Sequence, residues 1–281
     1  MDKPAGPTSH DVVARARRLF GTRAVGHTGT LDPFATGLII LVFGGATRLA
    51  RWAERHSKTY RAVIRLGRTT DTDDGTGATI AECVPREWPS NASVEAALDR
   101  LRGTQLQRPP AYSARRVGGE RSHRLARRGG RPEPAPTEVT VSRLTLVACE
   151  ASVITIEAEV SAGTYIRALA RDLGELLGTG ACTESLRRER IGPWHVADAV
   201  PLADLTGRET LLPPLALLAG LPEVPLRADE LPAVRLGRDV ARESPTEGEA
   251  ALVDDGRLVA VGRAVPNGWH PAVVLPPHGD K

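Results

Sequence analysis

The sequence predicts a mixed fold of α-helices and β-strands, divided into two domains. Residues 9–20 and 164–177 carry apolar side chains at helical intervals, whereas residues 60–66 and 152–160 alternate as strands do. The length of 281 residues favours one large domain and a smaller one, because a single core stops growing at roughly 250 to 300 residues. A content of 41% hydrophobic and 25% charged residues is ordinary for a folded chain.

The N-terminal part of the chain predicts two helices separated by a loop. Thr8 or Ser9 is a suitable N-cap for a helix over 9–20, which Gly21 ends. A glycine-rich loop over 26–37 leads into the apolar run 38–43. A second helical pattern follows over 46–56.

The middle of the chain reads as a strand over 60–66, a polar turn over 71–77 and a short helix over 93–101. We expect Ser93 to cap this helix and Pro109-Pro110 to end it. Two β-rich stretches, 138–148 and 152–160, pair most simply as an antiparallel hairpin.

The last helix predicted in the large domain spans 164–177. Its inner face is apolar, and its other face holds Arg167, Arg171 and Asp172. Beyond Pro213-Pro214 the chain breaks into short β-like pieces with turns, so we place a boundary near residue 222. The expected domains are therefore 1–222 and 223–281.

Positive charge is concentrated in one segment of the chain. Between Arg108 and Arg131 there are eight arginines and a single acid, Glu120, whereas the whole chain has a net charge of only +3. Arginines at this density suit a polyanion, because each can bind phosphate and release counterions. A solvated basic surface is the alternative, and charge alone does not decide between them.

The sequence lacks the motifs typical of several classes of protein. The three cysteines show no C-x-x-C spacing and the seven histidines no metal-ligand spacing, so we expect neither disulfides nor a bound metal, and a reducing cytoplasm fits best. Residues 38–43, the longest apolar stretch, are too few to span a bilayer. The sequence also lacks a Walker A loop, a dinucleotide fingerprint and a nucleophile elbow. Their absence argues against a nucleotide cofactor and against a serine hydrolase.

The loop GHTGTLDPFATG at 26–37 holds one carboxylate, Asp32, immediately before a proline. Pro33 biases Asp32 towards an extended backbone, and the glycines allow another chain or a ligand to approach closely. Taken alone, Asp32 is better explained as a cap for the turn that follows, with Pro33 at its first position.

The 26–37 loop is one of four separated motifs in the chain. The others are DKPAGPTS at 2–9, KTYR at 58–61 and GTYIR at 163–167. Together with LRR at 186–188 and PAYSA at 110–114, they closely resemble the TruB family of tRNA pseudouridine-55 synthases. The resemblance runs from residue 2 to about residue 200, in the same order and at compatible spacing. Family members commonly have a short apolar strand before D-K-P, so the start at Met1-Asp2 predicts that one edge strand is missing.

The resemblance implies an α+β catalytic domain built on a large, mostly antiparallel sheet, followed by a small β-rich, PUA-like domain. The family converts one uridine of the tRNA T-loop, at position 55, to pseudouridine without a metal or an organic cofactor. By motif match, Asp32 is the catalytic aspartate, Tyr60 the active-site aromatic residue and Arg167 the basic partner of the carboxylate.

The chemistry of the reaction agrees with these roles. The enzyme must break the N1–C1′ bond, rotate a uracil held outside the base stack and rejoin it through C5. A carboxylate can attack C1′ or C6, or remove the C2′ proton, and the sequence leaves all three routes open. Each needs Asp32 ionised, which a nearby Arg167 guanidinium favours.

The resemblance also assigns substrate contacts. Tyr60 offers a ring for stacking on uracil, worth about 1–3 kcal/mol, and a hydroxyl that could move the C5 proton. His27 would fill the space left by the flipped base, and Lys3 would contact the RNA backbone or support the loop. Tyr165 would pack beneath the base or Asp32, and Leu186 would line the uracil pocket.

The arginine-rich segment, about 107–137, matches the family insertion that clamps the T-arm. Within it we expect contacts from Arg115, Arg116, Arg121 and Arg124, although Glu120 and His123 depart from the residues common in the family. The expected partner is tRNA alone, bound by a monomer without an obligate protein partner. A different class of function, a tRNA-folding chaperone that acts without chemistry, is the alternative.

Overall fold

The computed structural model describes residues 1–130, 132–242 and 247–276. The chain forms two compact units. The first contains residues 1–8, 31–38 and 55–199, and the second contains 9–30, 39–54 and 200–281.

The first unit is built on one large sheet. In the described part of the chain this sheet has eight strands, and all neighbours along it are antiparallel except β3 and β13, which are parallel. The order is β1 (Asp2–Lys3), β3 (Thr36–Leu38), β13 (Ala181–Ile191), β5 (Lys58–Leu66), β12 (Val153–Val160), β11 (Thr137–Glu150) and β8 (Gly103–Gln107), with β14 (Trp194–His195) paired to β13.

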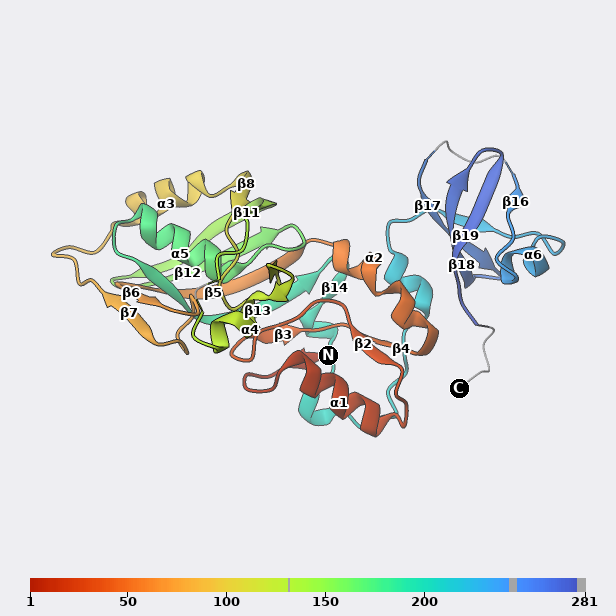
Figure 1. Cartoon of the computed structure of the whole chain (residues 1–281), viewed down its shortest axis with the longest axis horizontal. Helices are drawn as coiled ribbons and strands as arrows, with labels where there is room; N and C mark the ends of the chain where they lie inside the picture. Colours follow the sequence, from red (N-terminus) through yellow and green to blue (C-terminus); the bar gives the residue numbers. More distant parts are fainter. Residues whose placement is uncertain (131, 243–246, 277–281) are drawn as a thin grey trace. The chain divides into compact units, whose positions relative to one another are not determined.

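Two helices, α3 (Asn91–Arg100) and α5 (Ile166–Leu176), lie over one face of this sheet (Figure 1). The alternation of β5 directs Tyr60, Ala62, Ile64 and Leu66 into the core, where they meet the apolar stripe of α5. Each large apolar side chain buried in this way stabilises the fold by about 1.5–3 kcal/mol. The core thus fixes α5 against β5 and β13.

The hairpin β11–β12 and the strand β5 confirm the sequence-based expectations. The expected N-cap of α3 is wrong: the helix begins at Asn91, and Ser90 Oγ accepts a hydrogen bond from Ser93 N at 3.2 Å. The prolines at 109–110 do not end this helix either, because strand β8 (Gly103–Gln107) intervenes.

Two smaller strand pairs complete the first unit. They are β6 (Arg68–Thr70) with β7 (Thr79–Glu82), and β9 (Arg116–Val117) with β10 (Glu120–Arg121). Helix α4 (Ser122–Arg127) directly follows β10, and the short 3-10 helix η2 (Val196–Asp198) follows β14.

The second unit combines N-terminal helices with a C-terminal sheet. Its five-stranded sheet has the order β15 (Glu223–Pro225), β17 (Glu249–Asp254), β18 (Arg257–Val265), β19 (Gly268–Val274) and β16 (Val240–Ala241). The other elements are α1 (Ser9–Leu19), β2 (Val25–His27), β4 (Leu41–Phe43), η1 (Gly44–Leu49), α2 (Ala50–Arg55), η3 (Leu202–Asp204), η4 (Pro214–Leu218) and α6 (Leu231–Arg235).

Helix α1 confirms the helix expected over 9–20, whereas the pattern over 46–56 begins as the 3-10 helix η1 before α2. Trp52 Nε1 donates to Glu249 Oε2 at 2.9 Å within this unit, so α2 is tied to the C-terminal sheet. The β-rich character expected for the C-terminal segment is confirmed, and the boundary near residue 222 stays a prediction.

Candidate active site

Asp32 lies on a short loop that leads into β3. The buried side chains of Leu31 and Ala35 anchor this loop in the core, and Ala35 N donates to Asp32 O at 3.1 Å. Gly6 N donates to Pro33 O at 2.8 Å, which ties the loop to the segment after β1. The Asp32 side chain remains 34% exposed. A rigid loop therefore presents an accessible carboxylate.

The end of the loop passes very close to β13, and this approach requires glycine. Gly37 has φ +103°, and a Cβ added there would lie 2.3 Å from Arg188 O. Residues 37 and 188 are direct partners in the parallel pairing of β3 with β13. The glycine of the motif thus lets the Asp32 loop dock on the central sheet.

Arg167, in the first turn of α5, holds the Asp32 carboxylate with two atoms. Its Nε lies 2.9 Å from Asp32 Oδ2, and its Nη2 donates to Asp32 Oδ1 at 3.2 Å. The Arg167 side chain is only 4% exposed. We expected it on the polar face of the helix, away from the apolar one, but the structure buries it because its donors meet acceptors from three other segments.

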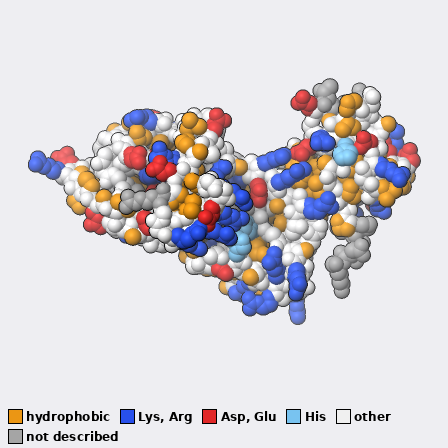
Figure 2. Space-filling view, viewed as in Figure 1, with side chains coloured by type: hydrophobic (Ala, Val, Ile, Leu, Met, Phe, Trp, Pro, Cys, Tyr) orange, Lys and Arg blue, Asp and Glu red, His pale blue; other side chains and the backbone are white. Residues whose placement is uncertain are grey.

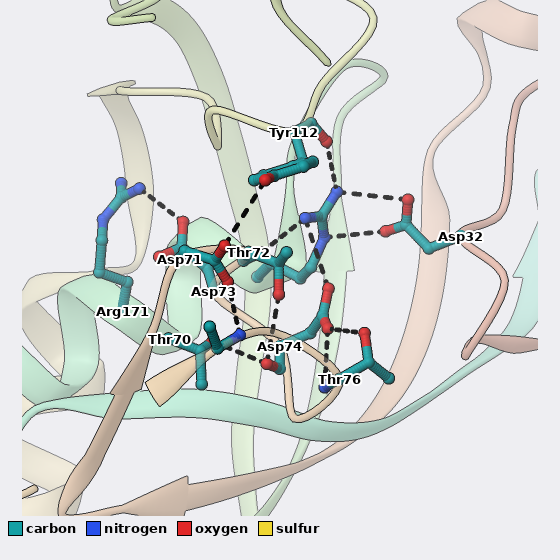
Figure 3. Close-up of polar contacts among 11 residues, drawn as sticks. Asp32, Thr70, Asp71, Thr72, Asp73, Asp74, Thr76, Tyr112 and Arg171 are labelled. Carbon is teal, nitrogen blue, oxygen red and sulfur yellow. Dashed lines mark hydrogen bonds and ion pairs between the residues drawn. The ribbon is translucent and has the colours of Figure 1, made fainter. Parts of the chain in front are cut away.

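Those acceptors occupy the remaining donors of the guanidinium. Nη1 donates to Thr72 O at 2.6 Å and lies 3.5 Å from Asp74 Oδ2, and Nη2 also donates to Tyr112 O at 3.0 Å. In Figure 3, dashed lines lead from Asp32, Thr72, Asp74 and Tyr112 to one unlabelled guanidinium, which these contacts identify as that of Arg167. Since a guanidinium has five N–H groups in a fixed plane, the contacts determine its orientation.

Asp74 is a second acid of the site, which sequence reasoning missed. Its side chain is 7% exposed, and its Oδ1 accepts from Thr76 N at 3.0 Å and from Thr76 Oγ1 at 2.6 Å. Gly75 N donates to Thr183 O at 2.8 Å, which fastens the 71–77 loop to β13. The run of three aspartates at 71, 73 and 74 was the available signal, because a buried arginine needs acidic partners.

Tyr60 and Leu186 belong to one buried apolar cluster in the same unit as Asp32. They come from the neighbouring strands β5 and β13, and both are less than 9% exposed. Leu31 and Ala35, which flank Asp32, belong to the same buried cluster. The structure therefore gathers Tyr60, Leu186 and the Asp32 loop around one core.

Lys3 and Tyr165, two further residues expected at the site, form hydrogen bonds with other residues of the chain. Lys3 is fully buried, and its Nζ donates to the carbonyls of Pro4, Pro7 and Pro33 at 2.9, 2.9 and 3.3 Å, which favours loop support over RNA contact. Burial lowers the pKa of the Lys3 ammonium, while the charge of Asp32 opposes this. The half-buried Tyr165 is fixed through its backbone by the side chain of Gln107.

His27 lies at the end of β2, in the second unit, with its ring centroid 5.7 Å from that of His10. Its expected contact with RNA stays a prediction.

The basic insertion forms the β9–β10 hairpin and α4. Its arginine side chains are exposed and gather over this part of the surface (Figure 2). Glu120 forms an ion pair with Arg128, and His123 N donates to Ser113 O at 3.1 Å, so both departures from the family pattern have internal partners. The exposed arginines are Arg108, Arg115, Arg116, Arg121, Arg124, Arg127 and Arg128, and Arg131 lies outside the described residues.

Within the described ranges, no group of three or more His, Cys, Asp or Glu side chains is arranged to hold a metal ion. The three cysteines are free thiols. None of the described helices combines the length and apolar character needed to cross a membrane.

Comparison with known proteins assigns the chain to a family. The model of the TruB family pseudouridylate synthase N-terminal domain matches residues 17–166, and that of the tRNA pseudouridylate synthase B C-terminal domain matches residues 167–212. This chain belongs to the TruB family. A tRNA pseudouridine synthase B of Solibacter usitatus is 42% identical over 98% of both chains, and one of Thermobifida fusca is 41% identical over 98% of this chain and 97% of its own.

Solved structures agree with the fold of the TruB family chain. An H/ACA RNP bound to a substrate RNA containing 2'-deoxyuridine matches with a TM-score of 0.75 at 23% identity, covering 99% of this chain and 84% of the other. A Cbf5-Nop10-Gar1 complex matches with a TM-score of 0.73 at 25% identity, covering 98% and 82%. The mixed sheet of the first unit is therefore a pseudouridine synthase fold.

Proposed function

We propose that this chain isomerises a uridine in the T-loop of tRNA to pseudouridine, with Asp32 as the essential carboxylate. The observation that carries the proposal is the ion pair of Asp32 with Arg167, in which the arginine is buried and the carboxylate is partly exposed. A structural ion pair has no need to leave its acid accessible. Membership of the TruB family supports the same reaction.

The reaction is an isomerisation, so the atomic composition of the nucleoside does not change. The N1–C1′ bond breaks, the C5–C1′ bond forms, the C5 proton leaves and N1 gains a proton. Asp32 starts the reaction by attack at C1′, by attack at C6 or by removal of the C2′ proton. On each route the two-point contact from Arg167 keeps the Asp32 carboxylate aimed at the reacting nucleoside.

The neighbouring residues are assigned to the base. Tyr60 stacks on the uracil ring and its hydroxyl moves the C5 proton, while Leu186 supports the base from the sheet. Their place in the buried cluster that flanks Asp32 supports these roles. Tyr165 packs beneath the site, Lys3 holds the loop, and His27 contacts the RNA that surrounds the flipped uridine.

The basic insertion is assigned to the T-arm. Arg115, Arg116, Arg121 and Arg124 are all exposed, as phosphate contacts require. Each contact released by an Arg→Gln change should reduce the slope of log affinity against log salt by about 1. A slope that stays at the wild-type value in all four variants would move the T-arm site elsewhere.

We further propose that the enzyme acts as a monomer in the cytoplasm, with residues 223–281 as an accessory domain. The family comparisons do not favour the chaperone as the sole activity.

The test is to incubate a tRNA transcript with wild type and Asp32→Ala, and to map pseudouridine by carbodiimide-stop sequencing. Wild type is expected to produce one stop in the T-loop and the variant none. Product formed by Asp32→Ala would refute the assignment. Faster tRNA folding with the inactive variant would show that a chaperone activity accompanies the enzyme.

A further inference from the structure

A second arginine on α5 contacts the surroundings of the active site. Arg171 lies one helical turn after Arg167, on the same side of the helix. Its Nη1 donates to Asp73 Oδ2 at 3.0 Å, and its Nη2 donates to Arg108 O at 2.9 Å. Its Nε and Nη2 also donate to Asp172 Oδ1, at 3.0 and 2.9 Å. Arg171 thus reaches two loops and its neighbour on the helix.

Those two loops are the ones that hold Arg167. Asp73 lies between Thr72 and Asp74, both of which contact Nη1 of Arg167. Arg108 begins the basic insertion, four residues before Tyr112, whose carbonyl accepts from Nη2 of Arg167. The two arginines therefore fasten the same pair of loops to one helix, at successive turns.

Asp73 links Arg171 to the pair of Arg167 and Asp32, because it binds Arg171 and lies between two residues that contact Arg167. Its φ of +59° lies in the left-handed region, which only a few per cent of residues other than glycine adopt. Its carbonyl accepts from Thr183 N at 3.0 Å, and its side chain is 16% exposed. Burial raises the pKa of the Asp73 carboxyl, whereas the charges of Arg171 and Arg167 lower it. Arg171 is therefore its main counter-charge and holds the turn that aims Thr72 O and Asp74 at Arg167.

We propose that Arg171 is a positioning residue of the isomerase, which orients Arg167, and through it Asp32, by fixing the 71–76 loop and the start of the basic insertion. Arg171 itself touches neither Asp32 nor the reacting atoms in this assignment. The inference rests on the proposed function and adds to it a residue four positions beyond the GTYIR motif.

The proposal predicts a loss in the chemical step with little change in tRNA affinity. A small rotation of Arg167 misplaces Asp32, and misplacements of about 1 Å can cost about a hundredfold in rate. The variant keeps all the exposed arginines of the insertion, so binding to phosphates persists. A purely structural role would lower stability while leaving the rate of the folded enzyme unchanged.

The experiment compares Arg171→Gln with wild type by single-turnover pseudouridine formation at saturating tRNA, with tRNA Kd measured on the same preparations. We expect the rate constant to fall about tenfold and Kd to change less than about twofold. Asp73→Asn should cause a similar loss, and the double variant should lose no more than either single change. Arg143→Gln is the matched control, since Arg143 is 55% exposed and pairs with Glu157 on the sheet surface.

An Arg171→Gln rate within about twofold of wild type would overturn the proposal, as would a loss of affinity with the saturating rate unchanged. If Arg171→Gln does not fold, Asp73→Asn decides the matter, and a wild-type rate in that variant overturns the proposal. Inactive wild type would instead refute the proposed function, which separates the two failures.

Discussion

Replacing Arg167 by lysine tests whether the shape of the guanidinium matters as well as its charge. Arginine directs five N–H groups in one plane, and in this site they meet two Asp32 oxygens, the carbonyls of Thr72 and Tyr112, and Asp74. A lysine ammonium has three N–H groups on a single atom. Arg167→Lys therefore leaves at least two of these acceptors without a partner.

The cost in stability depends on which acceptors lose their partner. An Asp32 oxygen can be hydrated, because that side chain is 34% exposed. An unpaired carbonyl of Thr72 or Tyr112 is partly buried and costs about 1–3 kcal/mol. At about 2–4 °C per kcal/mol for a protein of this size, we expect Tm to fall by about 2–12 °C.

The cost in activity should exceed the cost in stability. Without the two-point contact Asp32 is free to rotate, and the single-turnover rate should fall by about a hundredfold or more. Thermal unfolding and single-turnover pseudouridine formation measure the two effects. Arg143→Lys, the same change at an exposed ion pair, should leave both nearly unchanged. An Arg167→Lys enzyme with the wild-type rate would refute the reasoning.

Three further variants test other parts of the structure. Gly37→Ala places a Cβ 2.3 Å from Arg188 O at φ +103° and should lower the unfolding free energy by about 3 kcal/mol or more. Gly6→Ala, at φ +105° with no described atom within 4 Å, should cost only about 1 kcal/mol, and equal losses in denaturant melts would contradict the close approach. Asp74→Asn removes a charge 3.5 Å from Arg167 Nη1 and should slow single-turnover product formation about tenfold; an unchanged rate would count against a role for Asp74. Burial raises the pKa of Asp172 above its ordinary value of 3.8, so between 3.8 and the folded pKa the folded state holds more protons, and the unfolding free energy falls as pH rises. Asp172→Asn should reduce the dependence of the unfolding free energy on pH, measured by denaturation at a series of acidic pH values. The same dependence as in wild type would contradict the raised pKa of Asp172.

Local patterns predicted the elements whose side chains alternate or repeat on one face. Strand β5, the β11–β12 hairpin and helix α5 follow directly from their apolar periodicity. Strands β8 and β13 of the main sheet are among those that gave no such signal. Strand β8 lies at the sheet edge and exposes Leu106, its one large apolar residue, and β13 carries several charged residues in a central position.

The contacts within the candidate site were harder to predict from the sequence than the motifs that carry its residues. Asp32 and Arg167 stand out in matched segments, but the burial of Arg167 depends on Thr72 and Tyr112, which are 95 and 55 residues away. The sequence predicts a polar turn over 71–77, and the structure confirms it. That Asp73 and Asp74 serve two arginines of α5 depends on long-range packing, which no local pattern encodes.

The most direct measurement for the central claim is tritium release from tRNA that carries uridine labelled at C5, with Asp32→Asn as the variant. The amide keeps the shape of the side chain and removes the charge that Arg167 holds. We expect tRNA to bind with wild-type affinity and no tritium to leave above background. Release at the wild-type rate would contradict the account, since the reaction would then need no carboxylate at residue 32.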